Sequence, residues 1–302
     1  MRWISALILL SILLSSSMTS HAKGRLLMTW SAATNMIALG VEDQVRLYDA
    51  HTQQLLAVLG GRGAALTALA WQPEGVLLAT GDANGRLCLW SVPDFRQECS
   101  TAESSDIRAL AWQANGARLA AAGSDRVQIW QTRPLALIAE WSAEGIVTAL
   151  AWQGDRLAVG GALRGTYEQG FLVRYDSIGN LQDRYTAELR PPLSLQSLGD
   201  DLLGVGTLFD VFIWQVTSRH YRPLYLPLGE GEFVHQVTWS PDAARALVLL
   251  GNRLLCFSET MPHSELKLTV PVEALIWHVE AGYIVLLTEN GSLSLIEAVK
   301  CG

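Results

Sequence analysis

The chain has 302 residues, of which 50% are hydrophobic and 17% are charged, and its formal net charge at pH 7 is −7. A chain of this size can bury one large core. The acidic balance, with no run of basic residues, argues against nucleic-acid binding, because phosphates are bound by a basic face. After the N-terminus no apolar run approaches the ~18 residues that a membrane span needs.

The N-terminal segment has the pattern of a secretory signal peptide. Arg2 supplies a short positive region, an apolar run extends from Trp3 to Leu14, and Ser20-His21-Ala22 forms a small-x-small end. The alternative, a membrane anchor, requires a longer apolar run than this one. We therefore predict a signal peptide over residues 1–22, and a periplasmic or secreted protein of residues 23–302 with no stable membrane span after cleavage.

One short sequence motif is repeated along the chain. LTALAW ends at Trp71, IRALAW at Trp112 and VTALAW at Trp152, in steps of 41 residues (71 to 112) and 40 residues (112 to 152). Self-similarity at about 40–45 residues indicates the blades of a β-propeller. Looser copies, which bring the number of units to seven, end at Trp30, Leu198, Trp239 and Trp277.

The repeated phrase is expected to form the innermost strand of each blade. The apolar runs are short and lie between Gly, Asp, Asn and Pro turns, which suits strands buried on both faces. The predicted inner strands are Leu26–Trp30, Leu66–Trp71, Ile107–Trp112, Val147–Trp152, Leu193–Leu198, Val234–Trp239 and Val272–Trp277. The sequence therefore predicts an all-β fold, a single seven-bladed β-propeller, in which most tryptophans are core residues.

The second unit shows the order of features most fully. LTALAW is followed by the turn Gln72–Gly75, the strand VLLATG, the turn Asp82–Gly85 and the strand RLCLW ending at Trp90. This order resembles the WD-repeat family, whose blades consist of an apolar strand, a Pro-Asp-Gly-like turn, a small-residue strand, an Asp-Gly turn and a strand ending in Trp-Asp. The resemblance extends over residues 25 to 298 and implies a binding propeller rather than an enzyme.

The chain departs from that family at one position in every unit. Family blades usually have Gly-His before the first strand, and this His joins a buried polar chain with Ser or Thr, Asp and Trp. Gly60-Gly61 stands in this place, and no unit has a Gly-His. We therefore expect the blades to be held by apolar packing rather than by that polar chain.

Export would permit disulfides between the four cysteines. If Pro93-Asp94 is a two-residue turn, Cys88 and Cys99 fall opposite each other on neighbouring strands. This pair can form a cross-strand disulfide or remain as two buried thiols. A second bridge, between Cys256 and Cys301, would tie the C-terminus to the neighbouring blade, but no register argument supports it.

The fourth unit carries an insertion between its second and third strands, Ala162–Gly170. It contains Arg164, Tyr167 and Glu168 between glycines, and function in repeat proteins often lies on such projecting loops. The alternative is a tolerated surface insertion. Loops that enter the first strands share this rim and make it acidic; the carboxylates expected there are Glu42, Asp43, Asp82, Asp106, Asp125 and Asp210.

Motifs for chemistry are missing from the sequence. No two histidines have a metal-ligand spacing, and no nucleophile elbow, phosphate loop or calcium loop is found. We therefore expect no catalytic residues, no metal and no cofactor, and an exported scaffold that binds a protein or peptide partner through Arg164, Tyr167, Glu168, Asp82, Asp125 and Asp210. The alternative is an exported propeller enzyme (a hydrolase, lactonase or quinone-dependent dehydrogenase) with a site over the central channel.

Strand counting also predicts how the ring closes. In the WD-repeat family the N-terminus supplies the outermost strand of the last blade. Here the first inner strand begins almost at the mature N-terminus, and Ser292–Ala298 is the third strand of the seventh unit. We therefore predict a three-stranded seventh blade whose outer strand exposes unpaired backbone groups, an edge that could accept a strand from a partner or remain solvated.

Overall fold

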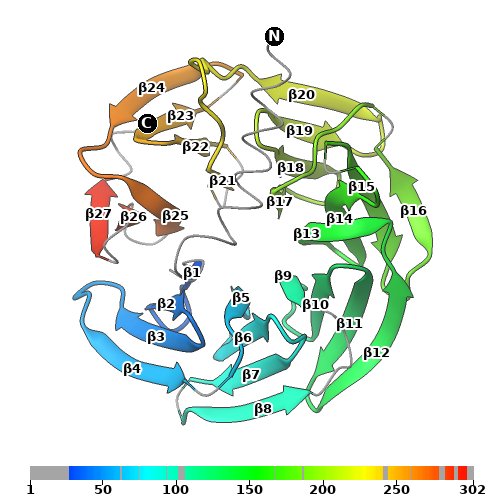
Figure 1. The fold of residues 1–302 in the computed structure, drawn as a ribbon, viewed down its shortest axis with the longest axis vertical. Coiled ribbons are helices and arrows are strands. Elements are labelled where there is room, and N and C mark those ends of the chain that lie inside the picture. Colours follow the sequence, from blue (N-terminus) through cyan, green and yellow to red (C-terminus); the bar gives the residue numbers. More distant parts are fainter. Residues whose placement is uncertain are drawn as a thin grey trace.

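The computed structural model describes residues 27–61, 63–73, 75–92, 94–100, 106–166, 168–185, 187–240, 244–258, 260–278, 283–288 and 292–297. Within these ranges the regular elements are all β-strands, and no helix long and apolar enough to cross a membrane is found. The expected signal peptide, Leu26, Tyr167, Ala298 and Cys301 lie outside the described residues. Seven antiparallel sheets are arranged around a central axis as the blades of a β-propeller (Figure 1).

Blades one to four each have four strands, numbered from the centre outward. Blade one consists of β1 (Leu27–Ser31), β2 (Met36–Val41), β3 (Gln44–Asp49) and β4 (Leu55–Gly60). Blade two consists of β5 (Leu66–Trp71), β6 (Leu77–Asp82), β7 (Leu87–Ser91) and β8 (Arg96–Ser100). Blade three consists of β9 (Ile107–Trp112), β10 (Arg118–Gly123), β11 (Arg126–Thr132) and β12 (Leu135–Ser142). Blade four consists of β13 (Gly145–Gln153), β14 (Arg156–Leu163), β15 (Gly170–Asp176) and β16 (Leu181–Arg184).

Blades five and six also have four strands, and blade seven has three within the described residues. Blade five consists of β17 (Ser194–Ser197), β18 (Leu202–Gly206), β19 (Val211–Gln215) and β20 (His220–Leu224). Blade six consists of β21 (Gln236–Trp239), β22 (Ala246–Leu250), β23 (Arg253–Phe257) and β24 (Pro262–Lys267). Blade seven consists of β25 (Val272–His278), β26 (Tyr283–Thr288) and β27 (Leu293–Glu297).

The predicted architecture is confirmed, including the three-stranded last blade. All seven predicted inner strands are the central strands of their blades, and the strands ending at Trp71 and Trp112 have the predicted bounds. The prediction is less accurate at the looser copies: β21 starts at Gln236, two residues after the predicted Val234. β13 begins earlier than predicted because a bulge between Val147 and Ala149 lets the pairing with β14 continue to Gly145.

The core lies between the faces of neighbouring blades, as the apolar strands require. The second strand of each blade is almost fully buried, because both its faces are covered by a neighbouring blade. Trp71, Trp112, Trp152 and Trp239 are all buried at equivalent places. The interpretation of the repeat tryptophans as core residues is therefore correct.

Glutamines that follow three of the repeat tryptophans join neighbouring blades from blade two to blade five. Gln72 Nε2 donates to the carbonyl of Gly116 in blade three at 2.8 Å. At the next repeat Gln113 Nε2 donates to Asp155 Oδ1 in blade four at 2.7 Å. Each bond joins the end of one inner strand to the first turn of the following blade, so the glutamines act as staples between blades.

The third glutamine of this series is the most heavily bonded. Gln153 Nε2 donates to the carbonyls of Gly199 at 3.2 Å and Leu202 at 3.0 Å in blade five. Its Oε1 accepts a bond from the buried guanidinium of Arg174 at 3.4 Å, and that guanidinium also pairs with Asp183 at 2.6 Å. The staple between blades four and five is thus part of a buried polar network.

Two of the repeat tryptophans add a second set of bonds between blades. Trp112 Nε1 donates to the Ala70 carbonyl, and Trp152 Nε1 donates to the Ala111 carbonyl, each at 3.0 Å. Blade two also keeps one link of the family's buried polar chain, because Trp90 Nε1 donates to Thr80 at 3.2 Å. Apolar clusters fill the core, as expected, but blade two departs from the expectation by keeping this one polar link. The glutamine and indole bonds add polar contacts between blades two to five.

Blade seven closes the ring by packing on blade one. Val285 and Leu287 of β26 lie against Ile37 and Leu39 of β2, with Tyr48 of β3 beside both pairs. No strand of blade one enters the sheet of blade seven among the described residues. Closure between these two blades is therefore an apolar contact of sheet faces.

The three described cysteines lie on the third and fourth strands of their blades. Cys88 of β7 and Cys99 of β8 are direct partners in the antiparallel register, and a disulfide joins them. Cys256 of β23 is disulfide-bonded as well. Its expected partner, Cys301, lies outside the described residues.

Candidate functional site

The insertion of blade four is shorter than the sequence suggested. β14 continues to Leu163 and β15 begins at Gly170, since Ala162 still pairs with Gly170 across the hairpin. Only residues 164–169, here called the insertion loop, project beyond the paired strands. The turn is closed by the amide of Leu163, which donates to the Gln169 carbonyl at 2.9 Å.

Two of the three predicted contact residues in the insertion loop are described. Arg164 and Glu168 are both exposed, and Tyr167 lies outside the described residues. The amide of Arg164 donates to the Glu144 carbonyl at the entrance to β13, so the loop lies on the rim where the first strands begin. The structure therefore places Arg164 and Glu168 where a partner could reach them.

Several carboxylates expected on this rim are engaged in their own turns. Asp82 is only 8% exposed, and its Oδ1 accepts the amides of Asn84 and Arg86, each at 2.9 Å. Asp210 is exposed but shares two hydrogen bonds with Thr207. These residues stabilise turns, so some of their polar groups are already engaged and less available to a partner.

The same rim also carries positive charge near blade four. Arg190 lies over the ring of Phe209, with its guanidinium carbon 4.9 Å from the ring centre. Arg164 adds a second cation. Asp125, another predicted contact residue, lies between β10 and β11 and is half-buried, so it adds a negative charge to the rim. The rim is therefore mixed in charge at the insertion loop rather than purely acidic.

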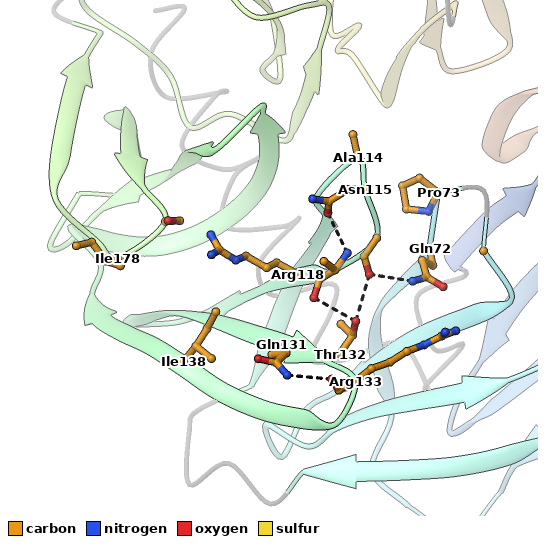
Figure 2. A pocket seen from close by; sticks show the side chains of 14 residues that line it. Gln72, Pro73, Ala114, Asn115, Arg118, Gln131, Thr132, Arg133, Ile138 and Ile178 are labelled. Atoms are coloured by element: carbon orange, nitrogen blue, oxygen red, sulfur yellow. Dashed lines mark hydrogen bonds between the residues drawn. The ribbon is translucent and has the colours of Figure 1, made fainter.

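A hollow among the described residues lies on the opposite rim. Its volume is about 960 Å³, and it is bounded by turns between first and second strands and by turns between third and fourth strands of blades two to four (Figure 2). We call it the blade-three groove; its lining residues are Gln72, Pro73, Gly75, Ala114, Asn115, Gly116, Ala117, Arg118, Gln131, Thr132, Arg133, Ile138, Ser177 and Ile178.

The floor of the blade-three groove is held by hydrogen bonds among its own residues. The Gly116 carbonyl accepts the hydrogen bond from Gln72 Nε2 and a second one from Thr132 Oγ1 at 3.2 Å. Gly116 has φ +68°, and a Cβ there would lie 2.7 Å from Gln72 Nε2, so glycine is required by backbone conformation and by space. The floor is therefore tied together by these hydrogen bonds, while the buried Gln72 Oε1 has no hydrogen-bond partner among the described residues.

The walls of the blade-three groove are apolar and cationic. Ile138 of β12 is 45% exposed and Ile178, in the turn after β15, is 71% exposed. Arg118 extends across the groove toward Ile178, and Arg133 extends toward the Gln72 side (Figure 2). Neither guanidinium forms an ion pair with any residue that the structure describes. Exposed isoleucines on the Arg118 side of the groove, together with two arginines that have no ion-pair partner among the described residues, can bind a segment that is both apolar and acidic.

The turn that presents Ile178 is itself fixed. Asp176 Oδ1 accepts the amides of Ile178 at 3.0 Å and Asn180 at 2.9 Å. A hydrogen bond from the Asn180 side chain, followed by these backbone bonds, holds the pKa of Asp176 below its ordinary value. The exposed isoleucine therefore stands on an ordered turn, which lowers the entropy lost when a partner binds.

The sequence did not point to the blade-three groove. Its residues come from four turns of three blades, and no single turn has a marked composition. The available signals were the three Trp-Gln pairs that end at Gln72, Gln113 and Gln153, and the apolar Ile178 within the polar turn Asp176–Asn180. Both become informative only when neighbouring blades are placed side by side.

The structure also bears on the alternative of an enzyme. Among the described residues no group of three or more His, Cys, Asp or Glu side chains is placed to hold a metal ion. The histidines are scattered over different blades: His51 follows β3, His220 begins β20, and His263 lies in β24.

Comparison with known proteins gives matches over the first three blades. Residues 28–97 match the family model of the anaphase-promoting complex subunit 4 WD40 domain, and residues 96–131 match that of the WD domain, G-beta repeat. The WD repeat-containing protein slp1 of Schizosaccharomyces pombe is 29% identical over 140 residues, which cover 44% of this chain and 28% of that protein. The chain thus aligns with less than a third of that relative's length.

Solved structures share the fold along nearly the whole chain. A chain in the crystal structure of the mitotic checkpoint complex has a TM-score of 0.74 at 16% identity, with 90% of this chain and 89% of that chain covered. A computationally designed protein, Ika8, has a TM-score of 0.69 at 16% identity, with 89% and 82% covered. The two family models and slp1 thus support a WD-repeat family, and the solved structures show that the propeller fold extends along nearly the whole chain.

Proposed function

We propose that this chain is an exported, non-catalytic scaffold that binds a protein or peptide partner, and that the blade-three groove holds an acidic and apolar segment of that partner. The observation that carries the proposal is the pairing of exposed Ile138 and Ile178 with Arg118 and Arg133 on one hydrogen-bonded floor. WD-repeat propellers commonly serve as protein-interaction scaffolds, which supports the class of function.

Export is supported by the N-terminal pattern and by the cysteines. Residues 1–22 have the composition of a cleavable signal peptide. The disulfide between Cys88 and Cys99 is of the kind that persists in oxidising compartments such as the periplasm or the exterior of the cell. A periplasmic or secreted location follows as part of the proposal, and N-terminal sequencing of the protein from the exported fraction tests it.

The groove is tested by capture of partners from the exported fraction with the mature chain as bait. The double variant Arg118→Glu, Ile178→Ser reverses one charge and removes one apolar anchor while leaving the floor intact. Both side chains are partly or largely exposed, so the fold should remain stable. We expect the captured partners to be lost, and the wild-type interaction to weaken as salt is raised, because it includes charge pairs.

Two matched variants make the result specific. Arg222→Glu, Met261→Ser makes the same chemical changes at exposed positions away from the groove and should leave capture unchanged. Arg164→Ala, Glu168→Ala removes the described contact residues of the insertion loop. If the insertion-loop variant loses the partners and the groove variant keeps them, the binding site is on the other rim and the groove assignment is wrong.

A further inference from the structure

The outer edge of blade seven differs from that of every other blade. The six other sheets end in a fourth strand, whereas β27 is the outermost described strand of blade seven (Figure 1). Its inner edge pairs with β26 from Leu293 opposite Leu287 to Glu297 opposite Tyr283. No described residue pairs with its other edge, here called the open edge. An unpaired strand edge presents a row of backbone donors and acceptors.

The strand that faces this position, β4 of blade one, is also unusual. The fourth strands β8, β12, β16, β20 and β24 each contain at least one charged residue, which is how exposed edges are ordinarily protected. β4 has the sequence LLAVLG and contains none. Leu55, Leu56 and Val58 are exposed by 53%, 48% and 48%. Blade one therefore presents an uncharged apolar outer strand.

The register shows which way these side chains face. Tyr48 and Arg46 of β3 are the partners of Leu55 and Val58. Tyr48 packs with the residues of blade seven, so Leu55 and Val58 lie on the same face of blade one, toward blade seven. Leu59, in contrast, belongs to the cluster shared with blade two and is buried. The exposed apolar face of β4 is thus the one that a fourth strand of blade seven would cover.

The side chains of β27 point alternately toward the two neighbouring blades. Leu293 packs toward blade one and Ile296 packs toward blade six, so a strand added at the open edge would present alternate residues to these two neighbours. Outer strands of neighbouring blades do meet elsewhere in the ring: the amide of Leu135 in β12 donates to Glu98 of β8 at 3.3 Å. Arg46, exposed on the same face as Val58, forms no ion pair with any described residue.

We propose that the open edge of β27 and the apolar face of β4 form a second interaction surface, which takes an extended segment of a partner polypeptide as the fourth strand of blade seven. The segment pairs antiparallel to β27, places apolar residues on Leu55 and Val58, and places an acidic residue near Arg46. Backbone bonds provide affinity, and the alternate side chains provide specificity. This surface is separate from the blade-three groove, so either can fail without the other.

The test uses a short fluorescent peptide that alternates valine and threonine around a central glutamate. We expect it to bind the full chain and to slow hydrogen exchange of the amides in residues 293–297. Two N-methylated versions each remove the donors from one edge of the peptide, and one of them should bind about tenfold more weakly or worse. Equal binding of the unmodified peptide and both methylated versions would overturn strand addition.

Variants test the apolar face separately. Val58→Arg should weaken peptide binding by about tenfold, whereas Leu181→Arg, at an equally exposed apolar site on β16, should not change it. Equal effects of the two changes would overturn the role of β4. Strong protection of residues 293–297 in the isolated monomer, or protection that arises only when the chain dimerises, would show that another part of this chain or a second copy occupies the edge, and would overturn the proposal.

Discussion

The glutamine staples predict a graded loss of stability when each is replaced by alanine. Gln72→Ala removes one hydrogen bond, and the Gly116 carbonyl keeps its bond from Thr132. At about 1 kcal/mol for a net hydrogen bond, the free energy of unfolding should fall by about 1 kcal/mol. Gln153→Ala removes bonds to two carbonyls and one from the guanidinium of Arg174. The same reasoning gives a loss of about 3 kcal/mol for that variant.

Gln113→Ala should fall between these two, at about 2 kcal/mol, because one of its two bonds is made to the carboxylate of Asp155. Urea unfolding followed by tryptophan fluorescence and by circular dichroism measures the series, with coincident transitions as the condition for comparing free energies. Gln97→Ala, on the exposed strand β8, is the control and should change stability little. Equal losses for the three staples, or none, would refute the idea that the repeat glutamines fix the blade spacing.

Two further predictions concern single blades. Replacing Cys88 by Ser removes a disulfide that joins residues 11 positions apart. The free energy of unfolding should fall by about 2–3 kcal/mol relative to the oxidised wild type. No change would mean that strand pairing alone holds the hairpin that contains Cys99. The hydrogen bond from the Asn180 side chain holds the pKa of Asp176 below its ordinary value, so this turn's contribution to stability is fully present above about pH 4 and is lost as the pH falls through the lowered pKa. An NMR titration of the Ile178 amide, compared with Asn180→Ala, checks this; an inflection at or above pH 4 would contradict it.

Much of the fold could be predicted because the repeated phrase marks the same strand position in each unit. The apolar phrase ending at Trp71, Trp112 and Trp152 is both an inner strand and a core position, so one pattern determines blade number, strand bounds and burial. The two-residue turn placed Cys88 opposite Cys99, as the structure has them. The expectation of three strands in the last blade followed from counting, and it is confirmed.

The candidate site was harder to predict, because it depends on how turns of different blades meet. The blade-three groove joins Gln72 in blade two to Ile178 in blade four, more than one hundred residues apart, through Gly116 between them. The insertion loop was overestimated because Ala162 and Gly170 continue the pairing of β14 and β15. Sequence patterns report which residues are buried in a blade, but not which turns of separate blades form a common surface.

Site-specific crosslinking tests the central claim most directly. A photo-reactive amino acid introduced in place of Ile178, in the blade-three groove, is compared with the same residue at Arg164 in the insertion loop and at Met261 outside both. After illumination in the exported fraction, we expect a covalent adduct from position 178 that maps to an acidic and apolar segment of a partner protein, and none from position 261. An adduct from position 164 alone, or none from any position despite a stable fold, would contradict the account.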